Sequence, residues 1–261
     1  MSVQERIEAA CRSLPDVRWS VCVSRGDRII AAIEPDRVLR IASVGKLLVL
    51  MAAAERIAAD PSFADRMLPR PSTPVSDSGL WQHLSPASIS VADACILIAS
   101  VSDNLATNAV IAEVGLDACN DIARRSGCPT FVLHDLVRDV RTPDDAPFLA
   151  QASARDAVRL LSLIDDNKSW SAVRTWLSLG VDHSMAMRAL GADPMSPGAT
   201  GETAHAHKTG SDPGVRADAG LIGPIGDALA YAVIANADPQ SPSMRAVPEA
   251  MRVILAAALE H

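Results

Sequence analysis

The order of secondary-structure signals along the chain constrains its fold more than any other feature. Strand-like stretches occur near both ends, within residues 18–33 and 205–234. Most of the chain between them, residues 43–179, has the apolar spacing of helices. Strands from the two ends are therefore expected to pair in one layer, which predicts an α+β fold with an all-α insertion.

We expect the two ends to form one discontinuous α/β subdomain, made of residues 1–41 and 190–258. Residues 42–189 are expected to form an all-α subdomain. The last residues, 259–261, resemble the remnant of a purification tag and carry no fold prediction.

The chain has 261 residues, of which 49% are hydrophobic, and a formal net charge of −7. It has no run of lysine and arginine, which argues against nucleic acid or an anionic membrane surface as a partner. No apolar leader opens the sequence, so we expect a cytoplasmic protein, or an exported one whose leader has been removed. The longest apolar stretch, residues 47–54, is too short to span a bilayer. Nothing in the sequence indicates an oligomeric state.

The five cysteines include no Cys-x-x-Cys pair, which predicts free buried thiols rather than a disulfide frame or a zinc site. His205 and His207 share one face of a predicted strand, as two metal ligands could. No third ligand lies in register with them. We therefore predict no metal site and no cofactor.

Lysine is rare in this chain. Of the 24 basic residues, only Lys46, Lys168 and Lys208 are lysines. An ammonium group can lose its proton when it is desolvated, whereas a guanidinium group cannot. A lysine kept where arginine is otherwise used is therefore a candidate for proton transfer.

The sequence Ser43-Val-Gly-Lys46 opens an apolar helical stretch. Residues three apart share a helix face, so the Lys46 amine can reach the Ser43 hydroxyl. A lysine with a lowered pKa can act as the base that activates a serine nucleophile, and a helix N-terminus stabilises negative charge beside it. The same residues also suit a helix cap followed by a solvated lysine. This motif alone does not decide between the two interpretations.

Two tripeptides complete the set of candidates. Residues 102–104 read Ser-Asp-Asn between two helical stretches, and residues 208–210 read Lys-Thr-Gly at the end of a predicted strand. Separately, the first also suits a polar turn that caps a helix, and the second a strand that ends in a glycine turn. The three motifs together, in this order, are far rarer by chance than any one of them.

With this motif set the sequence resembles the class A β-lactamases and the penicillin-binding proteins. The resemblance extends to residues 97–115, around Ser-Asp-Asn, and to residues 208–216. It implies a β-lactamase-like fold: an antiparallel five-stranded sheet with flanking terminal helices, plus an all-α subdomain. It also implies a serine hydrolase that forms an acyl-enzyme with a small-molecule amide, a β-lactam or a peptide-like substrate.

The resemblance assigns catalysis to three side chains. Ser43 would be the nucleophile, Lys46 its general base, and Ser102 the relay that gives a proton to the leaving nitrogen. Substrate binding falls to the other motif residues and their neighbours: Asn104, Lys208, Thr209, Gly210, Ser211 and Arg216. Lys208 and Thr209 would bind a substrate carboxylate with help from Arg216, and the N–H groups of Ser43 and Ser211 would form the oxyanion hole.

The sequence departs from class A enzymes at the glutamate that activates the deacylating water. That position falls near Val137, and no glutamate occurs between residues 114 and 201. Asp135 and Asp139 are candidate replacements, with His134 a weaker one. Each aspartate also suits a solvated loop with Asp–Arg pairs.

Three functions fit this pattern. The first is a β-lactamase-like hydrolase that is acylated at Ser43 but lacks the usual deacylating glutamate. The second is a peptidase, esterase or acyltransferase that acts on a cytoplasmic metabolite. The third is a pseudo-enzyme or sensor that binds without turnover, which the intact Ser43, Lys46 and Lys208 disfavour. The missing glutamate argues against efficient β-lactam hydrolysis.

Overall fold

The structure is a computed structural model that describes residues 1–195 and 204–260. Its centre is a five-stranded antiparallel sheet with strand order β2-β1-β10-β9-β8. The strands are β1 (Arg18–Arg25), β2 (Arg28–Ile33), β8 (His205–Asp212), β9 (Val215–Ile222) and β10 (Leu229–Asn236). Strands from both chain ends thus share one sheet, and the predicted α+β fold is confirmed.

Strands β1 and β10 join the two ends of the chain. They pair along their whole length, from Arg18 opposite Asn236 to Arg25 opposite Leu229. All eight residues of β10 are buried. A strand buried on both sides requires a cover on each face of the sheet.

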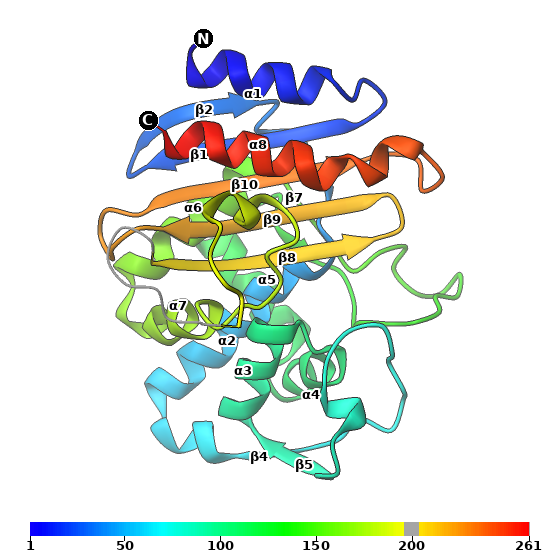
Figure 1. The fold of residues 1–261 in the computed structure, drawn as a ribbon. Helices are drawn as coiled ribbons and strands as arrows, with labels where there is room; N and C mark the ends of the chain where they lie inside the picture. Colours follow the sequence, from blue (N-terminus) through cyan, green and yellow to red (C-terminus); the bar gives the residue numbers. More distant parts are fainter. Residues whose placement is uncertain (196–203, 261) are drawn as a thin grey trace.

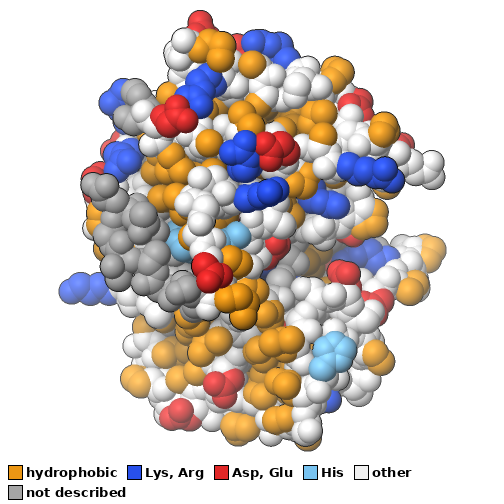
Figure 2. Space-filling view, viewed as in Figure 1, with side chains coloured by type: hydrophobic (Ala, Val, Ile, Leu, Met, Phe, Trp, Pro, Cys, Tyr) orange, Lys and Arg blue, Asp and Glu red, His pale blue; other side chains and the backbone are white. Residues whose placement is uncertain are grey.

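The terminal helices cover one face of the sheet (Figure 1): α1 (Val3–Arg12) and α8 (Val247–Leu259). Ile7 of α1 and Met251 of α8 are fully buried beneath them. An ion pair between Arg6 and Glu260 joins the two ends of the chain. Figure 2 shows acidic and basic side chains next to one another over this layer, in keeping with paired surface charges.

On the opposite face of the sheet, α6 packs against β1, β9 and β10 and α7 packs against β8, and the other helices lie beyond them (Figure 1). These helices are α2 (Lys46–Ala59), α3 (Val91–Val101), α4 (Asn104–Val114), α5 (Leu116–Arg125), α6 (Ala154–Asp166) and α7 (Ser171–Leu177). Nine consecutive residues of α2, Lys46 to Ala54, are buried. A helix buried all round needs neighbours on every side, and α3, α4, α5 and α7 supply them.

Short strands tie the loops to this framework. They are β3 (Leu39–Arg40), β6 (Val132–Leu133) and β7 (Ala150–Ala152) in one small sheet, and β4 (Met67–Pro69) and β5 (Ser88–Ser90) in another. The loop of residues 134–149 runs from β6 to β7 and projects at the right of Figure 1. The sequence predicted a loop here, but it gave no sign of the two strands at its ends.

All five cysteines are free and buried, as predicted. No helix in the described part of the chain is long and apolar enough to cross a membrane. The division into residues 1–41 with 190–258 and residues 42–189 stays a prediction. So does the tag origin of residues 259–261, of which His261 lies outside the described residues.

Candidate active site

Ser43 lies in a 3-10 helix, Ala42–Gly45, that leads directly into α2. The preceding Ala42 has φ +45°, a left-handed conformation that costs energy for a residue with a Cβ. Ser43 is half-buried and lines a cavity of about 560 Å³. The sequence predicted an α-helix from Ser43 itself. The α-helix in fact begins at Lys46, so the nucleophile candidate lies in the tighter turn before it.

Lys46 is fully buried at the start of α2. Its Nζ lies 2.6 Å from the backbone oxygen of Ser102, 2.6 Å from Asn104 Oδ1 and 3.2 Å from Ser102 Oγ. None of the hydrogen bonds in the described residues joins Lys46 to the Ser43 side chain. The structure therefore brings Lys46 of the first motif into contact with Ser102 and Asn104 of the second.

The environment of Lys46 favours its neutral form. Burial lowers the pKa of Lys46 well below its usual value, and the neighbouring Lys208 lowers it further, while Asp103 and Asp77 act in the opposite direction. A neutral amine has two N–H bonds, and these can donate hydrogen bonds to the two oxygens that lie 2.6 Å away. Its lone pair then stays free to accept a proton from a hydroxyl group, as a general base must.

The turn between α3 and α4 holds the second motif. Ser102 ends α3 in the left-handed conformation, with φ +58°. Asp103 is buried, caps α4 and accepts the N–H groups of Leu80 and Trp81, each at 2.7 Å. The interpretation as a helix cap is therefore correct for Asp103, whereas Ser102 and Asn104 contact Lys46.

Gly210 allows β8 to pass directly against the turn that carries Ser43. A Cβ at this position would lie 2.2 Å from the Ile41 oxygen and 3.0 Å from the Ser43 nitrogen. Because no side chain fits there, the third motif requires glycine at this place. Ser211 follows on β8 and lines the same cavity as Ser43.

Lys208 is almost fully buried, and its Nζ donates a hydrogen bond to the Thr209 oxygen at 2.9 Å. Burial lowers the pKa of Lys208 to about 8, although the acidic Asp182 and Asp218 act to raise it. The amine is therefore mostly protonated at neutral pH. The Thr209 hydroxyl donates to Asp182 Oδ2 at 2.7 Å.

The predicted site residues are divided between two cavities that flank the Lys46 cluster. Those that line the cavity of about 560 Å³ are Ser43, Asn104 and Ser211. Those that line a second cavity, of about 260 Å³, are Ser102, Lys208 and Thr209. Eight of the nine residues predicted to catalyse or bind substrate thus lie in or against one region, with Gly210 packed on the Ser43 turn.

Arg216, the ninth, lines neither of these two cavities. It lines a third cavity, of about 360 Å³, which shares four residues with the first: Asp77, Ser211, Asp212 and Pro213. Its Nη1 donates to the backbone oxygens of Asp212 and Val215, at 3.1 and 2.7 Å. The guanidinium group is therefore hydrogen-bonded to the backbone at the β8–β9 turn.

Val137 occupies the position where the glutamate of class A enzymes was expected. The Asn108 side chain holds its backbone: Nδ2 donates to the Val137 oxygen and Oδ1 accepts its N–H, both at 2.9 Å. The Val137 residue lines the Ser43 cavity. An apolar residue thus lies beside the nucleophile candidate on a loop that is fixed to α4.

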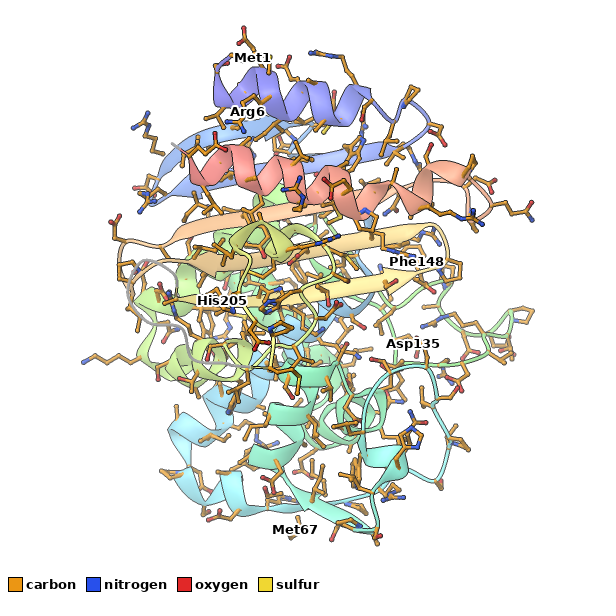
Figure 3. All side chains as sticks on the ribbon, viewed as in Figure 1. Met1, Arg6, Met67, Asp135, Phe148 and His205 are labelled. Atoms are coloured by element: carbon orange, nitrogen blue, oxygen red, sulfur yellow. The ribbon has the colours of Figure 1, made fainter. Side chains whose placement is uncertain are left out.

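Of the two predicted acids, Asp139 alone lines that cavity. Hydrogen bonds from Ser76, from its N–H at 2.9 Å and its Oγ at 2.7 Å, lower the pKa of Asp139 and weaken it as a base. Asp135 instead forms ion pairs with Arg138 and Arg141, at 2.8 and 2.7 Å, on the projecting loop (Figure 3). The interpretation of Asp135 as one half of an Asp–Arg pair in a loop therefore holds.

The histidines have other surroundings. His134 packs edge-on against Phe148, with ring centroids 5.1 Å apart. His183 lies next to both histidines of β8, with centroids 5.1 Å from His205, which is labelled in Figure 3, and 5.3 Å from His207. The sequence missed this neighbour because it comes from a distant loop. Within residues 1–195 and 204–260, no three His, Cys, Asp or Glu side chains are placed to hold a metal ion.

Sequence reasoning missed four residues of the site: Ser76, Asp77, Asn108 and Asp182. Asn108 could have been found, because it follows Asn104 by four residues and so shares its helix face. Ser76 and Asp77 lie in a Pro/Ser-rich loop and Asp182 follows a helix, where no sequence pattern marks them.

Comparisons with known proteins agree on the family. The sequence model of the β-lactamase enzyme family matches residues 2–259. No functionally curated protein matches the sequence significantly.

Solved structures share the fold across nearly the whole chain. A β-lactamase from Sphaerobacter thermophilus is 24% identical, with a TM-score of 0.83 over 98% of this chain and 95% of that one. The protein PBP-A is 19% identical, with a TM-score of 0.80 over 99% and 94%. A class A β-lactamase from Mycobacterium abscessus is 19% identical, with a TM-score of 0.75 over 98% and 99%. The match of the family model to almost every residue, on a fold of this kind, shows that the chain belongs to the β-lactamase enzyme family and is a serine hydrolase.

Proposed function

We propose that this hydrolase is acylated at Ser43 by a β-lactam or a related amide, and that its acyl-enzyme is hydrolysed slowly. The observation that carries the proposal is the buried Lys46 amine, which directly follows the Ser43 turn and contacts both Ser102 and Asn104. Its lowered pKa gives it the lone pair that acylation requires.

In the proposed acylation, Ser43 Oγ attacks the substrate carbonyl carbon and its proton passes to Lys46 Nζ. The N–H groups of Ser43 and Ser211 stabilise the negative charge that develops on the carbonyl oxygen. Gly210 supports this arrangement, because it allows β8 to lie against the Ser43 turn. The C–N bond then breaks. The leaving nitrogen takes a proton from Ser102, which recovers one from Lys46 across 3.2 Å.

Slow deacylation is supported by two residues that line the same cavity as Ser43. Val137 offers no group that could activate water, and Asp139 is held by two hydrogen bonds from Ser76. A structural neighbour with the same fold, a point mutant of PBP-A, is described as an acyl-enzyme complex with penicillin G. We propose an acyl-enzyme of the same kind for this protein, with a long lifetime that follows from its own cavity residues.

The proposal is tested with a chromogenic cephalosporin and benzylpenicillin, by following colour and the intact mass of the protein over time. The expected result is a stoichiometric adduct that persists for many minutes and is absent in Ser43→Ala. Rapid steady turnover with no adduct would show that deacylation is fast. If parent and Ser43→Ala both stay unmodified, the proposed acylation is wrong.

Val137→Glu should shorten the lifetime of the acyl-enzyme at least tenfold, because it places a carboxylate at the cavity beside Ser43. A positioned general base contributes about 10²–10⁴-fold in rate, so a tenfold gain allows for imperfect placement. Val137→Gln is the matched control, with similar size and no basic carboxylate. Lifetimes are read by mass spectrometry after removal of free penicillin, and equal lifetimes for the two variants would contradict this role of the position.

A further inference from the structure

The Thr209 hydroxyl, which the family resemblance assigns to a substrate carboxylate, already has a carboxylate partner within the chain. Its Oγ1 donates to Asp182 Oδ2 at 2.7 Å. The other oxygen, Asp182 Oδ1, accepts the Ser184 N–H at 3.1 Å. Both oxygens of Asp182 are thus engaged, and the carboxylate is held in one position beside Thr209.

Asp182 lines the same cavity of about 260 Å³ as Ser102, Lys208 and Thr209. On the proposed acylation route, this is the side on which the leaving nitrogen departs. The carboxylate acts directly on the Lys208 amine, whose pKa it raises against the effect of burial. A second anion that enters this cavity would therefore meet a cation that is already partly neutralised.

Another group in the cavity accepts hydrogen bonds. His207 is almost fully buried and lines the cavity, and its Nε2 has no hydrogen-bond partner among the described residues. Its Nδ1 contacts the Asp218 carboxylate at 3.2 Å, so in the neutral ring Nδ1 carries the proton and Nε2 is an acceptor. The Tyr231 hydroxyl donates to the same Asp218 oxygen at 2.9 Å. The cavity thus presents the Asp182 carboxylate and, from His207, a ring nitrogen with no partner among the described residues.

We propose that Asp182 is a specificity-determining residue that stands where a substrate carboxylate would bind, so that the enzyme prefers substrates whose leaving-group side is uncharged or carries a hydrogen-bond donor. This inference rests on the proposed acylation at Ser43 and narrows its substrate class. A carboxylate-bearing β-lactam must displace Asp182 from Thr209, or bind without that hydroxyl. An ester or amide at the same place meets no like charge.

The test compares benzylpenicillin with its methyl ester, which differ only in that carboxylate. Second-order acylation rates are measured at pH 6, well below the Lys208 pKa of about 8 in the parent, for the parent and for Asp182→Asn. Asparagine keeps the shape and the acceptor oxygen but removes the charge. We expect the acid-to-ester rate ratio to rise about tenfold, the effect of relieving a partly screened contact between like charges. Asp193→Asn, a change at an exposed acid that lines none of the three cavities, is the charge control and should leave the ratio unchanged.

Equilibrium binding of the same two compounds to Ser43→Ala, with and without Asp182→Asn, provides a second measurement that needs no acylation. If the acid-to-ester ratio stays constant in both measurements, or follows Asp193→Asn equally, the inference is wrong. If the parent is never acylated and the binding ratio still rises with Asp182→Asn, the proposed function fails and the role of Asp182 stands.

Discussion

Two of the three lysines are buried in the candidate site, and their environments differ. Lys46 has only neutral oxygens as hydrogen-bond partners, whereas Lys208 lies near the acidic Asp182 and Asp218. The first is therefore suited to losing its proton and the second to keeping it at neutral pH. The rarity of lysine in the sequence identified both residues as candidates, but it could not predict that their pKa values would be suited to different roles.

Lys46→Ala should lower the rate of acylation of Ser43 by about 10²–10⁴-fold, the usual contribution of a general base. Lys168→Ala, at the exposed third lysine, should leave that rate unchanged. Both rates can be measured by mass spectrometry at several penicillin concentrations. A loss of less than tenfold in Lys46→Ala would mean that another group takes the proton.

Lys208 should make the folded protein more stable as the pH rises from about 8 to about 10.5. The pKa of Lys208 is about 8 in the folded protein, against 10.5 for an unperturbed lysine. Between these two pH values Lys208 is protonated in the unfolded chain and mostly neutral in the folded protein. Below pH 8 the folded protein bears the full cost of burying the charged amine, and this cost disappears as the pH rises to 10.5. The free energy of unfolding should therefore increase by roughly 3 kcal/mol, at about 1.4 kcal/mol for each unit of pKa difference. Lys208→Met should lack this contribution and keep only the one from Lys46, whose pKa is also lowered by burial. Urea unfolding of both proteins at pH 7.5 and 10.5 measures it, and parallel stabilities would contradict the assignment.

At the scale of elements, the site depends on one close contact between the sheet and a helical turn. Strand β8 passes so near the Ser43 turn that only glycine fits at position 210. The turn itself is held from the other side, where the Ile41 N–H donates to the Ala150 oxygen of β7 at 3.1 Å. The nucleophile candidate is therefore fixed between two sheets.

Gly210→Ala should reduce the acylation rate at least tenfold, because the added Cβ pushes β8 away from Ser43 and moves the Ser211 N–H with it. Val233→Ala, a cavity mutation in β10, is the control for stability, with a loss of about 1–3 kcal/mol and little effect on rate. Urea unfolding and acylation are measured on both variants. If Gly210→Ala lowers the acylation rate no more than Val233→Ala does for a similar loss of stability, the contact at Gly210 does not orient the site.

Most elements could be predicted from the sequence, and the failures have local causes. The strands at both ends and the long helices carry clear periodicity, and their bounds lie within a few residues of the prediction. The turn at Ala42–Gly45 was missed because its left-handed Ala42 is imposed by tertiary contacts, which propensity does not encode. Strands β6 and β7 are too short to show a period. Asp182 was missed for a similar reason, since a lone aspartate after a helix resembles any surface residue.

At the scale of the whole molecule, the chain leaves the sheet, builds the helical part and returns to the sheet. The pairing of β1 with β10 closes this path, and α6 packs against the sheet from within the helical segment. The order of signals in the sequence was sufficient to predict this plan. It could not predict which helix would cover the sheet, because α5 is as amphipathic as α6 and lies elsewhere, against α2.

Because the path is closed in this way, we expect the two parts to unfold together. Leu50→Ala, in the core around α2, and Met251→Ala, beneath α8, should each lower the free energy of unfolding by about 2–5 kcal/mol. Circular dichroism and tryptophan fluorescence should report one coincident transition in both variants. Separate transitions, with each mutation moving only one, would instead support two independent subdomains.

The burial of Lys46 and Lys208 has a practical consequence. The third lysine, Lys168, is exposed, so an amine-selective reagent meets one accessible side-chain amine on the native surface, besides the terminal amino group. Each further label would have to attach to Lys46 or Lys208, which requires the structure around that lysine to open to solvent. The rate at which further labels appear would therefore measure how often the surroundings of Lys46 and Lys208 open to solvent.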